Sequence, residues 1–519
     1  MLPEFRNEPN FDFSEQTNID QFQAALDDLR ATLGETYPMV IGGEQIQLDD
    51  VFPSINPANP QEILGYFQNG TVEHANQATE AAAEAFETWQ HTPAEDRVRY
   101  ILRASAEMRR RRFEFCAMMV LEAGKSWAEA DGDVCEAIDF MEYYARQMLR
   151  IADSSQTLND TPGEELRLEY VPLGVGAVIP PWNFPNAILT GLVAAALVAG
   201  NTVVLKPAEQ TPLTGYKVAE IFWKIGLPPG VLNFVTGPGE VVGEQMVLHP
   251  KTRFIAFTGS REVGVGIYEK ASKIQPGQRW LKRSILEMGG KNAVIVDETA
   301  DLDAAAQGIV AGAFGFQGQK CSAGSRAIIV DSIYDQLEEK IVALAKPIKI
   351  GPTDQAPDVY MGPVIDTEAV DKINHYLTVG AQESQLLLGG QTLTDASQGY
   401  FFQPTIFGEV DPNAHIAQEE IFGPVLALIR AQDYDTALEI ANATEYGLTG
   451  SVYSNDRARL ERARREFHVG NLYFNRKCTG SMVSQNPFGG FNMSGTDSKA
   501  GGPDYLLQFT QAKSITEQL

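Results

Sequence analysis

The sequence predicts an α/β protein with more than one domain. From about residue 176 onward, short apolar strand-like segments alternate with helix-like segments. This alternation is typical of parallel sheets that are covered by helices on both faces. The chain has 519 residues, which is too long for one hydrophobic core. Its apolar and charged fractions, 44% and 21%, are those of an ordinary globular protein, so disorder is not expected.

The region before this alternation is predicted to be mainly helical. A helical pattern covers residues 22–33, and short strand-like pieces follow to about residue 67. Residues 72–150 then carry apolar side chains at the three- and four-residue spacing of helices. Residues 153–165 are rich in turn formers, and residues 166–171 alternate like an antiparallel strand.

Two strand–helix series follow. In the first, we predict strands at 176–180, 202–206, 232–236 and 253–258, with helices at 184–199, 214–225 and 240–248. The second series begins near residue 292 and continues to about residue 470. The boundary therefore falls near Leu286, beside Glu287. Active sites usually occupy such a cleft between domains.

Charge and hydropathy exclude several classes of function. The chain has 41 basic and 68 acidic residues, a net charge of -27, which opposes binding to nucleic acid or to an anionic membrane. The apolar stretch 187–200 is shorter than the roughly 20 residues of a membrane-spanning helix, so we predict a buried helix there. The N-terminus has neither a signal-peptide core nor a transit-peptide pattern. We therefore expect a cytoplasmic protein.

The cysteines and histidines predict neither a disulfide framework nor a metal site. The four cysteines include no CxxC pair, and the six histidines are scattered singly. Cys321 is the candidate nucleophile, because its neighbours are small or polar; the alternative is a small buried hydrophobe. A free thiol is only a few per cent ionised at neutral pH, and Lys320 could favour the thiolate. Cys116 and Cys135 fall in amphipathic helices, whereas Cys478 lies in a loop that could adjoin a site.

Two further side chains suit covalent chemistry at Cys321. Glu287 precedes Gly289 and Gly290, so its carboxylate has room to move, as a base acting in a single step requires. Asn183 lies in a turn stiffened by prolines. That turn could cap the following helix, or it could present the Asn183 amide to a developing oxyanion.

Glycine-rich turns after two predicted strands suggest a nucleotide site. Gly237-Pro-Gly-Glu-Val-Val-Gly243 has one residue more than the usual dinucleotide motif before its last glycine, so it is either an anion-binding turn or a plain tight turn. Ser260 follows another strand in the same way. Lys206 and Glu209 follow a third strand and could bind a ribose or form a surface ion pair. A carboxylate at that place favours NAD over NADP.

Six motifs, taken together, resemble those of the aldehyde dehydrogenase superfamily in order and spacing. They are Pro181-Trp-Asn-Phe-Pro185, Lys206-Pro-Ala-Glu209, Phe257-Thr-Gly-Ser260, Leu286-Glu-Met-Gly-Gly290, Gly318-Gln-Lys-Cys321 and Glu420-Ile-Phe-Gly-Pro424. The resemblance runs from about residue 40 to the end. It implies an aldehyde dehydrogenase-like α/β fold, with an atypical Rossmann NAD-binding domain, an α/β catalytic domain and a β-flap for oligomerisation.

The resemblance also implies roles for individual residues. Cys321 would be the nucleophile, Glu287 the base that activates water, and Asn183 an oxyanion donor together with the Cys321 amide. NAD would be the cofactor, with its adenosine ribose, pyrophosphate and nicotinamide ribose and ring held by Lys206, Glu209, Gly237, Gly243, Ser260, Glu420 and Phe422. The unusual glycine spacing is expected for this superfamily.

Four segments resemble the branch of the superfamily that oxidises L-glutamate γ-semialdehyde to L-glutamate in proline and arginine catabolism. They are Phe5-Arg-Asn-Glu-Pro9, residues 314–322, residues 464–476, and Thr479-Gly-Ser481 ahead of Pro487-Phe-Gly-Gly490. The resemblance implies that the substrate carboxylate meets Ser322, Gly480 and Ser481, and that Phe184 and Phe488 flank its aliphatic part. The alternative is a dehydrogenase of another small aldehyde, with NAD or NADP.

The resemblance further implies domain limits and self-association. The NAD-binding domain would comprise residues 1–152 and 173–285, and the catalytic domain residues 286–485. Residues 153–172 and 486–519 would form the β-flap and the C-terminal segment. We expect this flap to contact a second copy of the chain in a homodimer or a larger homo-oligomer.

Overall fold

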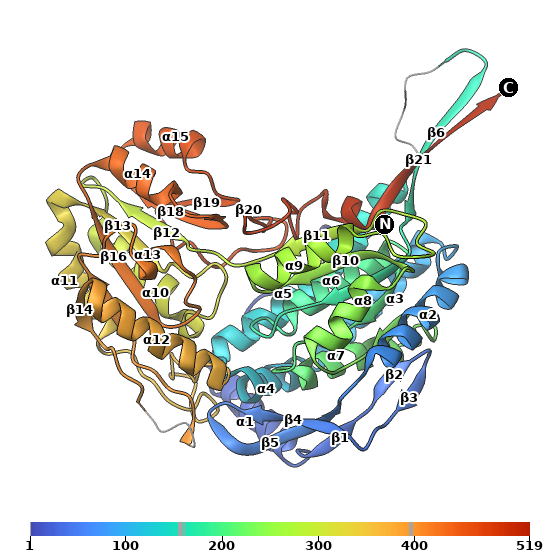
Figure 1. Cartoon of the computed structure of the whole chain (residues 1–519), viewed down its shortest axis with the longest axis horizontal. Helices are drawn as coiled ribbons and strands as arrows, with labels where there is room; N and C mark the ends of the chain where they lie inside the picture. The colour runs from blue at the N-terminus through green and yellow to red at the C-terminus, as the bar shows by residue number, and fades with distance from the viewer. Residues whose placement is uncertain (1, 154–157, 159–160, 394–397) are drawn as a thin grey trace.

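The first half of the molecule is built on a seven-stranded sheet. The computed structural model describes residues 2–153, 158, 161–393 and 398–519. The strands of this sheet are β2 Met39–Ile41, β3 Glu44–Ile46, β7 Val175–Ile179, β8 Thr202–Leu205, β9 Leu232–Phe234, β10 Thr252–Thr258 and β11 Arg283–Glu287. Their order is β11-β10-β7-β8-β9-β2-β3 (Figure 1). Strands β7 to β11 pair in parallel, whereas β2 is antiparallel to both neighbours. The predicted parallel sheet is confirmed.

Helices cover both faces of this sheet because its strands are apolar on both sides. One face packs against α2 Val72–Trp89, α8 Glu244–Leu248 and α9 Arg261–Ser272. The other packs against α6 Ala187–Val198 and α7 Pro212–Lys224. Helix α6 is apolar all round and almost wholly buried, as the sequence predicts for residues 187–200. In the described part of the chain, no helix is both long and apolar enough to cross a membrane.

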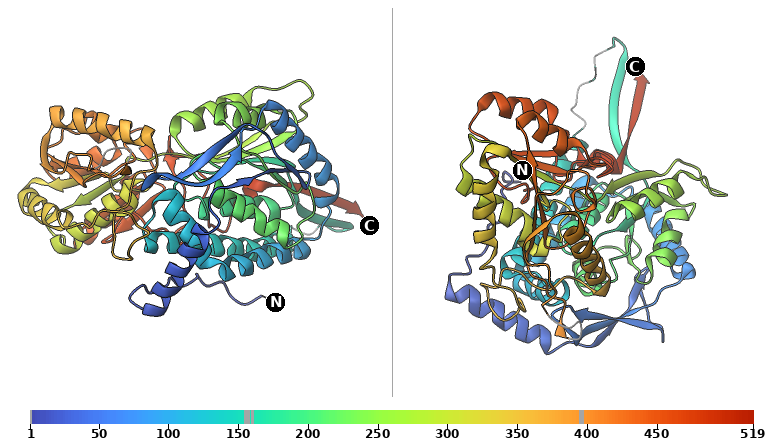
Figure 2. Two further views of the ribbon diagram at one scale, coloured as in Figure 1. Left: turned by 90° about the horizontal axis from the view of Figure 1, so that it is seen from below. Right: turned by 60° about the vertical axis from the view of Figure 1, so that its left-hand side comes forward.

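The N-terminal region packs further helices against α6 and α7. It contains α1 Gln16–Arg30, α3 Ala94–Arg110, α4 Arg112–Ala123 and α5 Trp127–Ala152, and a small sheet of β1 Glu35–Tyr37, β4 Val51–Asn56 and β5 Asn59–Gln68. The left view of Figure 2 shows the N-terminal segment and α1 on one face of the molecule. Helix α5 packs against both α3 and α6, so it reaches the centre of the protein.

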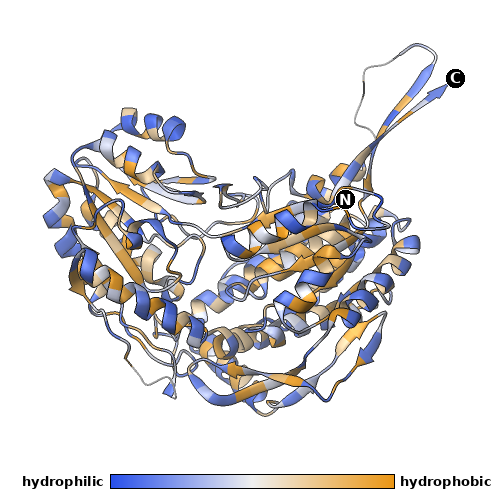
Figure 3. Cartoon of the chain, in the orientation of Figure 1, coloured by the Kyte–Doolittle hydropathy of each residue, from blue (hydrophilic) through white to orange (hydrophobic). Residues whose placement is uncertain are grey.

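A second seven-stranded sheet forms the other half. Its strands are β12 Ala293–Val296, β13 Arg326–Val330, β14 Gln385–Leu388, β15 Thr405–Gly408, β16 Val425–Ala431, β18 Thr449–Tyr453 and β19 Asn471–Phe474, in the order β14-β15-β16-β13-β12-β18-β19. Only the pairing of β14 with β15 is antiparallel among these described strands. One face packs on α10 Leu302–Phe314 and α11 Tyr334–Ala345, and the other on α12 Thr367–Glu383, α14 Tyr434–Asn442 and α15 Arg457–Glu466. Figure 3 shows the apolar strands enclosed by helices with hydrophilic outer faces.

The two sheets meet at residues 288–292. Strand β11 ends at Glu287 in the first sheet, and β12 begins at Ala293 in the second. Shorter elements complete this half, namely α13 His415–Gln418, β17 Tyr446–Gly447, which pairs with β20 Phe491–Asn492, and the 3₁₀ turns η2 Gly315–Gly318 and η3 Asp331–Ile333. The 3₁₀ turn η5 Tyr505–Phe509 packs against α5 and α6 in the first half. The change of sheet thus lies beside the predicted base.

A two-stranded arm projects from the body of the protein. It consists of β6 Glu164–Pro172 and β21 Thr510–Gln518, which pair antiparallel from end to end (Figure 1). These are the two segments that the resemblance pairs in a β-flap. Residues 154–157 and 159–160 of the predicted flap lie outside the described residues. The helix predicted at 240–248 differs slightly, because it begins as a π-helical turn, η1 Gly239–Gly243, before α8.

Candidate active site

A cavity of about 690 Å³ lies between α5, α6 and the loops at the junction of the two sheets. Its wall contains both the candidate nucleophile and the candidate base. It also contains all of the predicted substrate contacts, so the residues brought together are Phe184, Glu287, Cys321, Ser322, Gly480, Ser481 and Phe488. Asn183 does not line the cavity. The fold therefore gathers seven predicted residues from distant parts of the chain around one space.

The turn before Cys321 has a strained backbone that is held by its neighbours. Phe316 and Gln317 have φ values of 49° and 56°, which side-chain-bearing residues seldom adopt. The Gln317 amide donates hydrogen bonds to the carbonyls of Gly124 and Pro363, at 3.0 and 2.8 Å. A Cβ atom on Gly318 would lie 2.3 Å from a main-chain oxygen. The Cys321 loop is thereby fixed in one conformation.

The side chain of Asn292 is hydrogen-bonded to the main chain around Cys321. Its Nδ2 donates to the carbonyls of Cys321 and Ala323, at 2.7 and 2.8 Å, and its Oδ1 accepts from the Thr449 amide at 2.9 Å. Asn292 is not among the site residues predicted from the sequence. The sequence feature that could have identified it is a carboxamide directly ahead of an apolar strand at the domain boundary. A buried polar group without a hydrogen-bond partner would lower stability there.

The thiol of Cys321 is not ionised at neutral pH. Burial raises its pKa to about 12, and the charges of Glu420 and Glu287 act in the same direction. The expectation that Lys320 would favour the thiolate is wrong, because Lys320 Nζ is ion-paired with Glu129 Oε1 at 2.5 Å. A neighbouring cation whose charge is already balanced has little effect on a buried thiol.

Glu287 is a buried carboxyl group in a position to accept a proton. Ser498 Oγ donates to its Oε1 at 2.8 Å, and the Gly490 amide donates to its Oε2 at 3.1 Å. Burial raises the pKa of Glu287 to about 8, although both hydrogen bonds oppose the shift. A base works best when its pKa lies near the working pH, so this carboxyl group suits general base catalysis.

Asn183 lies beside the Cys321 loop rather than in the wall of the cavity. It is buried, and its Nδ2 donates to the Gln319 carbonyl at 3.0 Å. The amide is thus attached to the chain two residues before the nucleophile. Its predicted contact with an oxyanion remains a prediction.

The predicted ribose contacts lie together against the glycine-rich turn. Lys206 Nζ is ion-paired with Glu209. A Cβ atom on Gly243 would lie 3.6 Å from Lys206 Cδ, so the turn passes directly over the lysine stem. Gly237 has a φ of +128°, and a Cβ atom there would lie 2.8 Å from the Gly70 amide nitrogen. Gly237 therefore packs the turn against Gly70, while Gly243 faces Lys206.

Ser260 caps the N-terminus of α9, and its neighbour Gly259 is hydrogen-bonded to Glu287. The Ser260 Oγ accepts a hydrogen bond from the Val263 amide at 3.3 Å, as a helix N-cap does. The Gly259 amide donates to the main-chain carbonyl of Glu287 at 3.1 Å. The start of α9, with its partial positive charge, is therefore attached to the strand end that carries the base.

Glu420 reaches the same junction from the second sheet. Its Oε1 accepts from the Gly290 amide at 2.9 Å, and a Cβ atom on Gly289 would lie 2.1 Å from its Oε2. Glycine at 289 is needed for this approach. Phe422 has a φ of 60° and meets the Trp182 ring edge to face, with ring centres 5.4 Å apart. A strained aromatic residue held in this way is typical of a binding surface.

The far end of the cavity is a tight loop, residues 479–486, which we call the anchor loop. Gly480 has a φ of +79°, and its carbonyl accepts from Arg476 Nη2 at 2.9 Å. The Ser481 hydroxyl donates to the Asn486 carbonyl, so it must turn before it can donate to a ligand. Phe488 pairs with Ala500 through two main-chain hydrogen bonds, at 2.9 and 2.8 Å. These contacts make a rigid end wall.

One wall of the cavity is acidic, which the sequence analysis did not predict. Glu129, Asp133 and Glu136 all line the cavity from α5. Burial raises the pKa of Glu136 to about 8. The Lys125 ammonium group lies 3.0 Å from Asp133 and 3.9 Å from the centre of the Phe184 ring. The carboxyl groups recur at positions i, i+4 and i+7 of one helix, and this spacing was the available signal.

Comparison with known proteins gives the same family that the six sequence motifs resemble. The model of the aldehyde dehydrogenase family matches residues 45–515. The 1-pyrroline-5-carboxylate dehydrogenase of Geobacillus thermodenitrificans is 57% identical over 518 residues, covering 100% of both chains. 1-Pyrroline-5-carboxylate dehydrogenase 2 of Bacillus subtilis is 53% identical over 517 residues, again covering 100% of both.

Solved structures agree with this result. The 1-pyrroline-5-carboxylate dehydrogenase from Thermus with bound NAD is 50% identical and superimposes with a TM-score of 0.97, covering 100% of both chains. Betaine aldehyde dehydrogenase from Staphylococcus aureus in complex with NAD⁺ is 31% identical, with a TM-score of 0.89, over 96% of this chain and 97% of that one. The fold implied by the motifs is confirmed, and the chain belongs to the aldehyde dehydrogenase family.

Proposed function

We propose that this protein oxidises L-glutamate γ-semialdehyde, the open form of 1-pyrroline-5-carboxylate, to L-glutamate with NAD. The observation that carries the proposal is the single cavity that joins Cys321 and Glu287 to the anchor loop. Relatives that match the chain over its full length are named for this activity. The cavity thus combines a nucleophile, a base and an end wall in one space.

The residues on the cofactor side fit NAD. Lys206 and Glu209 offer an ammonium group and a half-exposed carboxylate beside a turn in which Gly243 leaves the surface open. The carboxylate would accept hydrogen bonds from ribose hydroxyls and would repel a 2′-phosphate. Ser260 and the start of α9 would meet the pyrophosphate. Glu420 and Phe422 would hold the nicotinamide ribose and ring.

The first chemical step takes place at Cys321. The Cys321 thiol gives its proton to solvent water, the sulfur attacks the aldehyde carbon, and the carbonyl oxygen becomes an oxyanion. Asn183 and the Cys321 amide would stabilise that charge, an effect worth about 3 kcal/mol for a single donor. When bound, NAD⁺ supplies the hydride acceptor, and the substrate carbon is left as a thioester on Cys321.

The second step is hydrolysis, for which Glu287 is the base. It takes a proton from water, and the resulting hydroxide attacks the thioester carbon. The carbon–sulfur bond then breaks, which releases L-glutamate, and the proton held by Glu287 returns to the departing sulfur, so that Cys321 is again a thiol. Dividing the oxidation between two steps in this way lowers each barrier. The pKa of Glu287, about 8, suits this transfer.

Each part of the substrate would meet a different part of the cavity wall. Phe184 and Phe488 would flank its aliphatic part, while Ser322, Gly480 and Ser481 would receive its carboxylate. Glu136 lines the same cavity and would accept a hydrogen bond from its ammonium group, whereas Glu129 and Asp133 are already ion-paired with Lys320 and Lys125. An apolar aldehyde would leave these polar groups without a partner, which costs binding energy.

The homodimer is also part of this proposal. Helix α9 and the segment that follows it expose a row of large apolar side chains, namely Val263, Val265, Tyr268, Ile274 and Leu281. Such a patch suits contact with another protein surface, here a second copy whose β6–β21 arm would lie nearby. Replacing Tyr268 with Glu should shift the mass measured by light scattering towards that of the monomer, and an unchanged mass would count against this face.

We place the protein in the cytoplasm. The sparse, unpaired cysteines support this location, because disulfides form and persist mainly in oxidising compartments outside the cytoplasm. The four thiols are free in the structure.

The activity is tested by following NADH with a panel of aldehydes. L-Glutamate γ-semialdehyde should be oxidised with the highest kcat/KM, ahead of succinate semialdehyde, betaine aldehyde and propanal. Cys321→Ala should abolish NADH formation but still bind NAD, as measured by calorimetry. Turnover by this variant would refute the covalent mechanism, and a preference for another aldehyde would refute the substrate assignment.

A further inference from the structure

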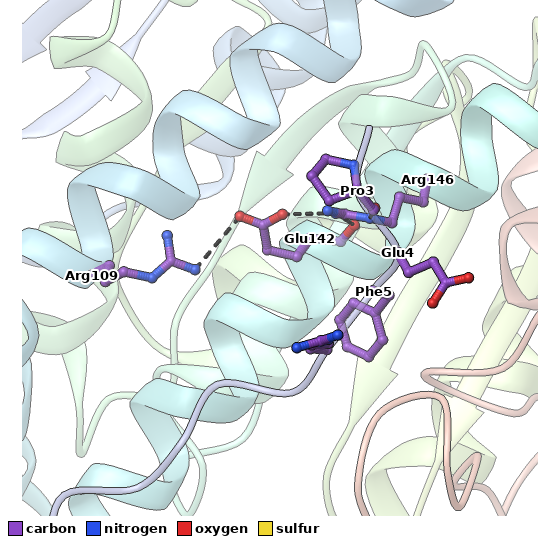
Figure 4. Close-up of a pocket in the computed structure, with 7 residues that line it drawn as sticks. Pro3, Glu4, Phe5, Arg109, Glu142 and Arg146 are labelled. Carbon is purple, nitrogen blue, oxygen red and sulfur yellow. Dashed lines mark hydrogen bonds and ion pairs between the residues drawn. The ribbon is translucent and has the colours of Figure 1, made fainter. Parts of the chain in front are cut away.

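An extended N-terminal arm, residues 2–13, lies across helix α5. The arm precedes residue 45, where the match to the family model begins. Arg146 Nε donates to the Pro3 carbonyl at 2.9 Å, and Phe5 meets the Tyr143 ring edge to face, with ring centres 5.2 Å apart. Figure 4 shows Pro3 and Phe5 beside Glu142 and Arg146, around a surface cleft of about 510 Å³.

Further along, the arm is bound to buried acidic residues of α5. Asp139 is 5% exposed, and its two oxygens accept from Asn7 Nδ2 at 2.8 Å and from the Glu8 amide at 2.7 Å. Asp131, which is fully buried, accepts from the Phe11 amide at 2.8 Å. Buried carboxylates that accept main-chain N–H groups fix a segment firmly in place.

Asn7 also contacts the anchor loop on its other side. Its Nδ2 donates a second hydrogen bond to the Val483 carbonyl at 3.0 Å, and its Oδ1 accepts from Gln485 Nε2 at 2.8 Å. Both N–H groups and the carbonyl oxygen of one carboxamide are therefore in use. They connect α5 to the loop that forms the end wall of the cavity.

The anchor loop has a backbone that needs such support. Ser484 has a φ of 70°, a left-handed conformation that favours glycine. Its amide donates to the Gly501 carbonyl at 2.9 Å, and Val483 is 3% exposed. A strained loop keeps its conformation only when surrounding contacts determine it.

We propose that Asn7 is a positioning residue that sets the place of the anchor loop and thereby the selectivity for an aldehyde that carries a carboxylate. Asn7 does not line the cavity, whereas Gly480 and Ser481 do, so it acts through them. The selectivity part rests on the proposed function. A shift of the loop changes the contacts of the substrate carboxylate but leaves the reacting atoms at Cys321 in place.

The kinetic test compares two aldehydes in Asn7→Ala and in a matched control. Asn18→Ala removes a carboxamide from a different residue, one that donates to the Asp12 carbonyl at 2.9 Å and lies away from the anchor loop. Asn7→Ala should raise KM for L-glutamate γ-semialdehyde about tenfold, with kcat changed less than about twofold. For propanal, which has no carboxylate, kcat/KM should stay within about twofold, as should KM for NAD. Asn18→Ala should behave as the wild type.

A second measurement needs no substrate. Hydrogen exchange at the amides of Ser484, Gln485 and Asn486 reports on the anchor loop directly, because each donates within the loop or to Gly501. Exchange there should be at least about tenfold faster in Asn7→Ala than in the wild type, and unchanged in Asn18→Ala. Gln485→Ala, which removes one of the three hydrogen bonds, should give a smaller increase.

Each outcome decides a separate point. Unchanged exchange in Asn7→Ala would overturn the positioning role, whatever the kinetics. Faster exchange with an equal loss on both aldehydes would overturn the selectivity role and leave a purely structural one. Failure of the wild type itself to oxidise L-glutamate γ-semialdehyde would overturn the proposed function and the selectivity with it, while the exchange result would still decide the position of the loop.

Discussion

The side-chain amide of Asn292 donates a hydrogen bond to the main-chain carbonyl of Cys321, with a nitrogen–oxygen distance of 2.7 Å. Asn292 belongs to the junction between the two sheets, and its Oδ1 also accepts from the Thr449 amide. The proposed nucleophile is thus held by a residue that does not line the cavity. We expect the position of its sulfur to depend on this amide.

Replacing Asn292 with Ala should reduce both stability and activity. The carbonyls of Cys321 and Ala323 would lose their donor, which costs about 1–3 kcal/mol for a buried acceptor. We expect a lower urea midpoint and a kcat reduced more than about tenfold. Asn374→Ala, at an exposed amide that contacts Thr392, is the control. Wild-type kcat in Asn292→Ala would show that the loop keeps its place without the amide.

Replacing Glu287 with Gln should separate the two chemical steps. Glutamine cannot take a proton from water, so the thioester should form but hydrolyse slowly. We expect a rapid burst of about one NADH per active site, followed by a rate at least about a hundredfold below that of the wild type. Stopped-flow absorbance measures both phases. Steady turnover at the wild-type rate would assign the base to another residue.

The pH dependence of hydrolysis should follow the pKa of Glu287. Only the ionised carboxylate acts as a base, so the rate should rise with pH through a midpoint near 8. The Ser498 hydrogen bond lowers this pKa, and Ser498→Ala should therefore move the midpoint upward by up to about one unit. The same change at Ser332, which is exposed, should have no effect. A midpoint that moves downward in Ser498→Ala would contradict this account.

The reactivity of Cys321 should depend on the charge of Glu420. That carboxylate raises the pKa of the thiol, so Glu420→Gln should lower the pKa and increase the thiolate fraction. We expect iodoacetamide to alkylate Cys321 at least about threefold faster at pH 7.5, as measured by mass spectrometry. Glu419→Gln is a matched control, because Glu419 contacts the Tyr376 hydroxyl instead. Equal rates in both variants would exclude the charge effect.

Alanine at Gly289 and at Gly290 should have different consequences. A Cβ atom on Gly289 would meet the flexible end of Glu420, so that side chain can move away. We expect KM for NAD to rise about tenfold with little change in the urea midpoint. A Cβ atom on Gly290 would lie 2.6 Å from the Cys321 carbonyl, which cannot move freely. This variant should lose about 1–3 kcal/mol of stability, and identical effects of the two substitutions would be unexpected.

Much of the fold could be predicted from local sequence patterns. The buried strands around Val203 and Val294 are short and almost wholly apolar, and α6 is apolar on every side, so the sequence of each segment indicates that it is buried. Motif resemblance supplied the pairing of β6 with β21, which joins segments more than 300 residues apart. No local pattern encodes such a pairing, because it depends on the whole topology.

The candidate site, too, could be predicted from the sequence only in part. Cys321 and Glu287 stand out because their neighbours are glycines and polar residues rather than core residues. The effect of Lys320 was misjudged, because its partner Glu129 lies 191 positions away in the sequence. Asn292 and Asn7 were missed as supporting residues for a related reason. Each acts through a contact that exists only when α5, the anchor loop and the sheet junction are assembled.

The segment from Glu287 to Asn292 links the base, the Glu420 contact and the support of the nucleophile within a few residues. A substitution there disturbs several functions at once, so such changes are rarely neutral. The anchor loop touches none of these groups in the contacts described above. If it receives the substrate carboxylate as proposed, selection or design can alter the preferred aldehyde through residues 479–486 while the reaction itself is preserved, and new substrate ranges would arise through this loop.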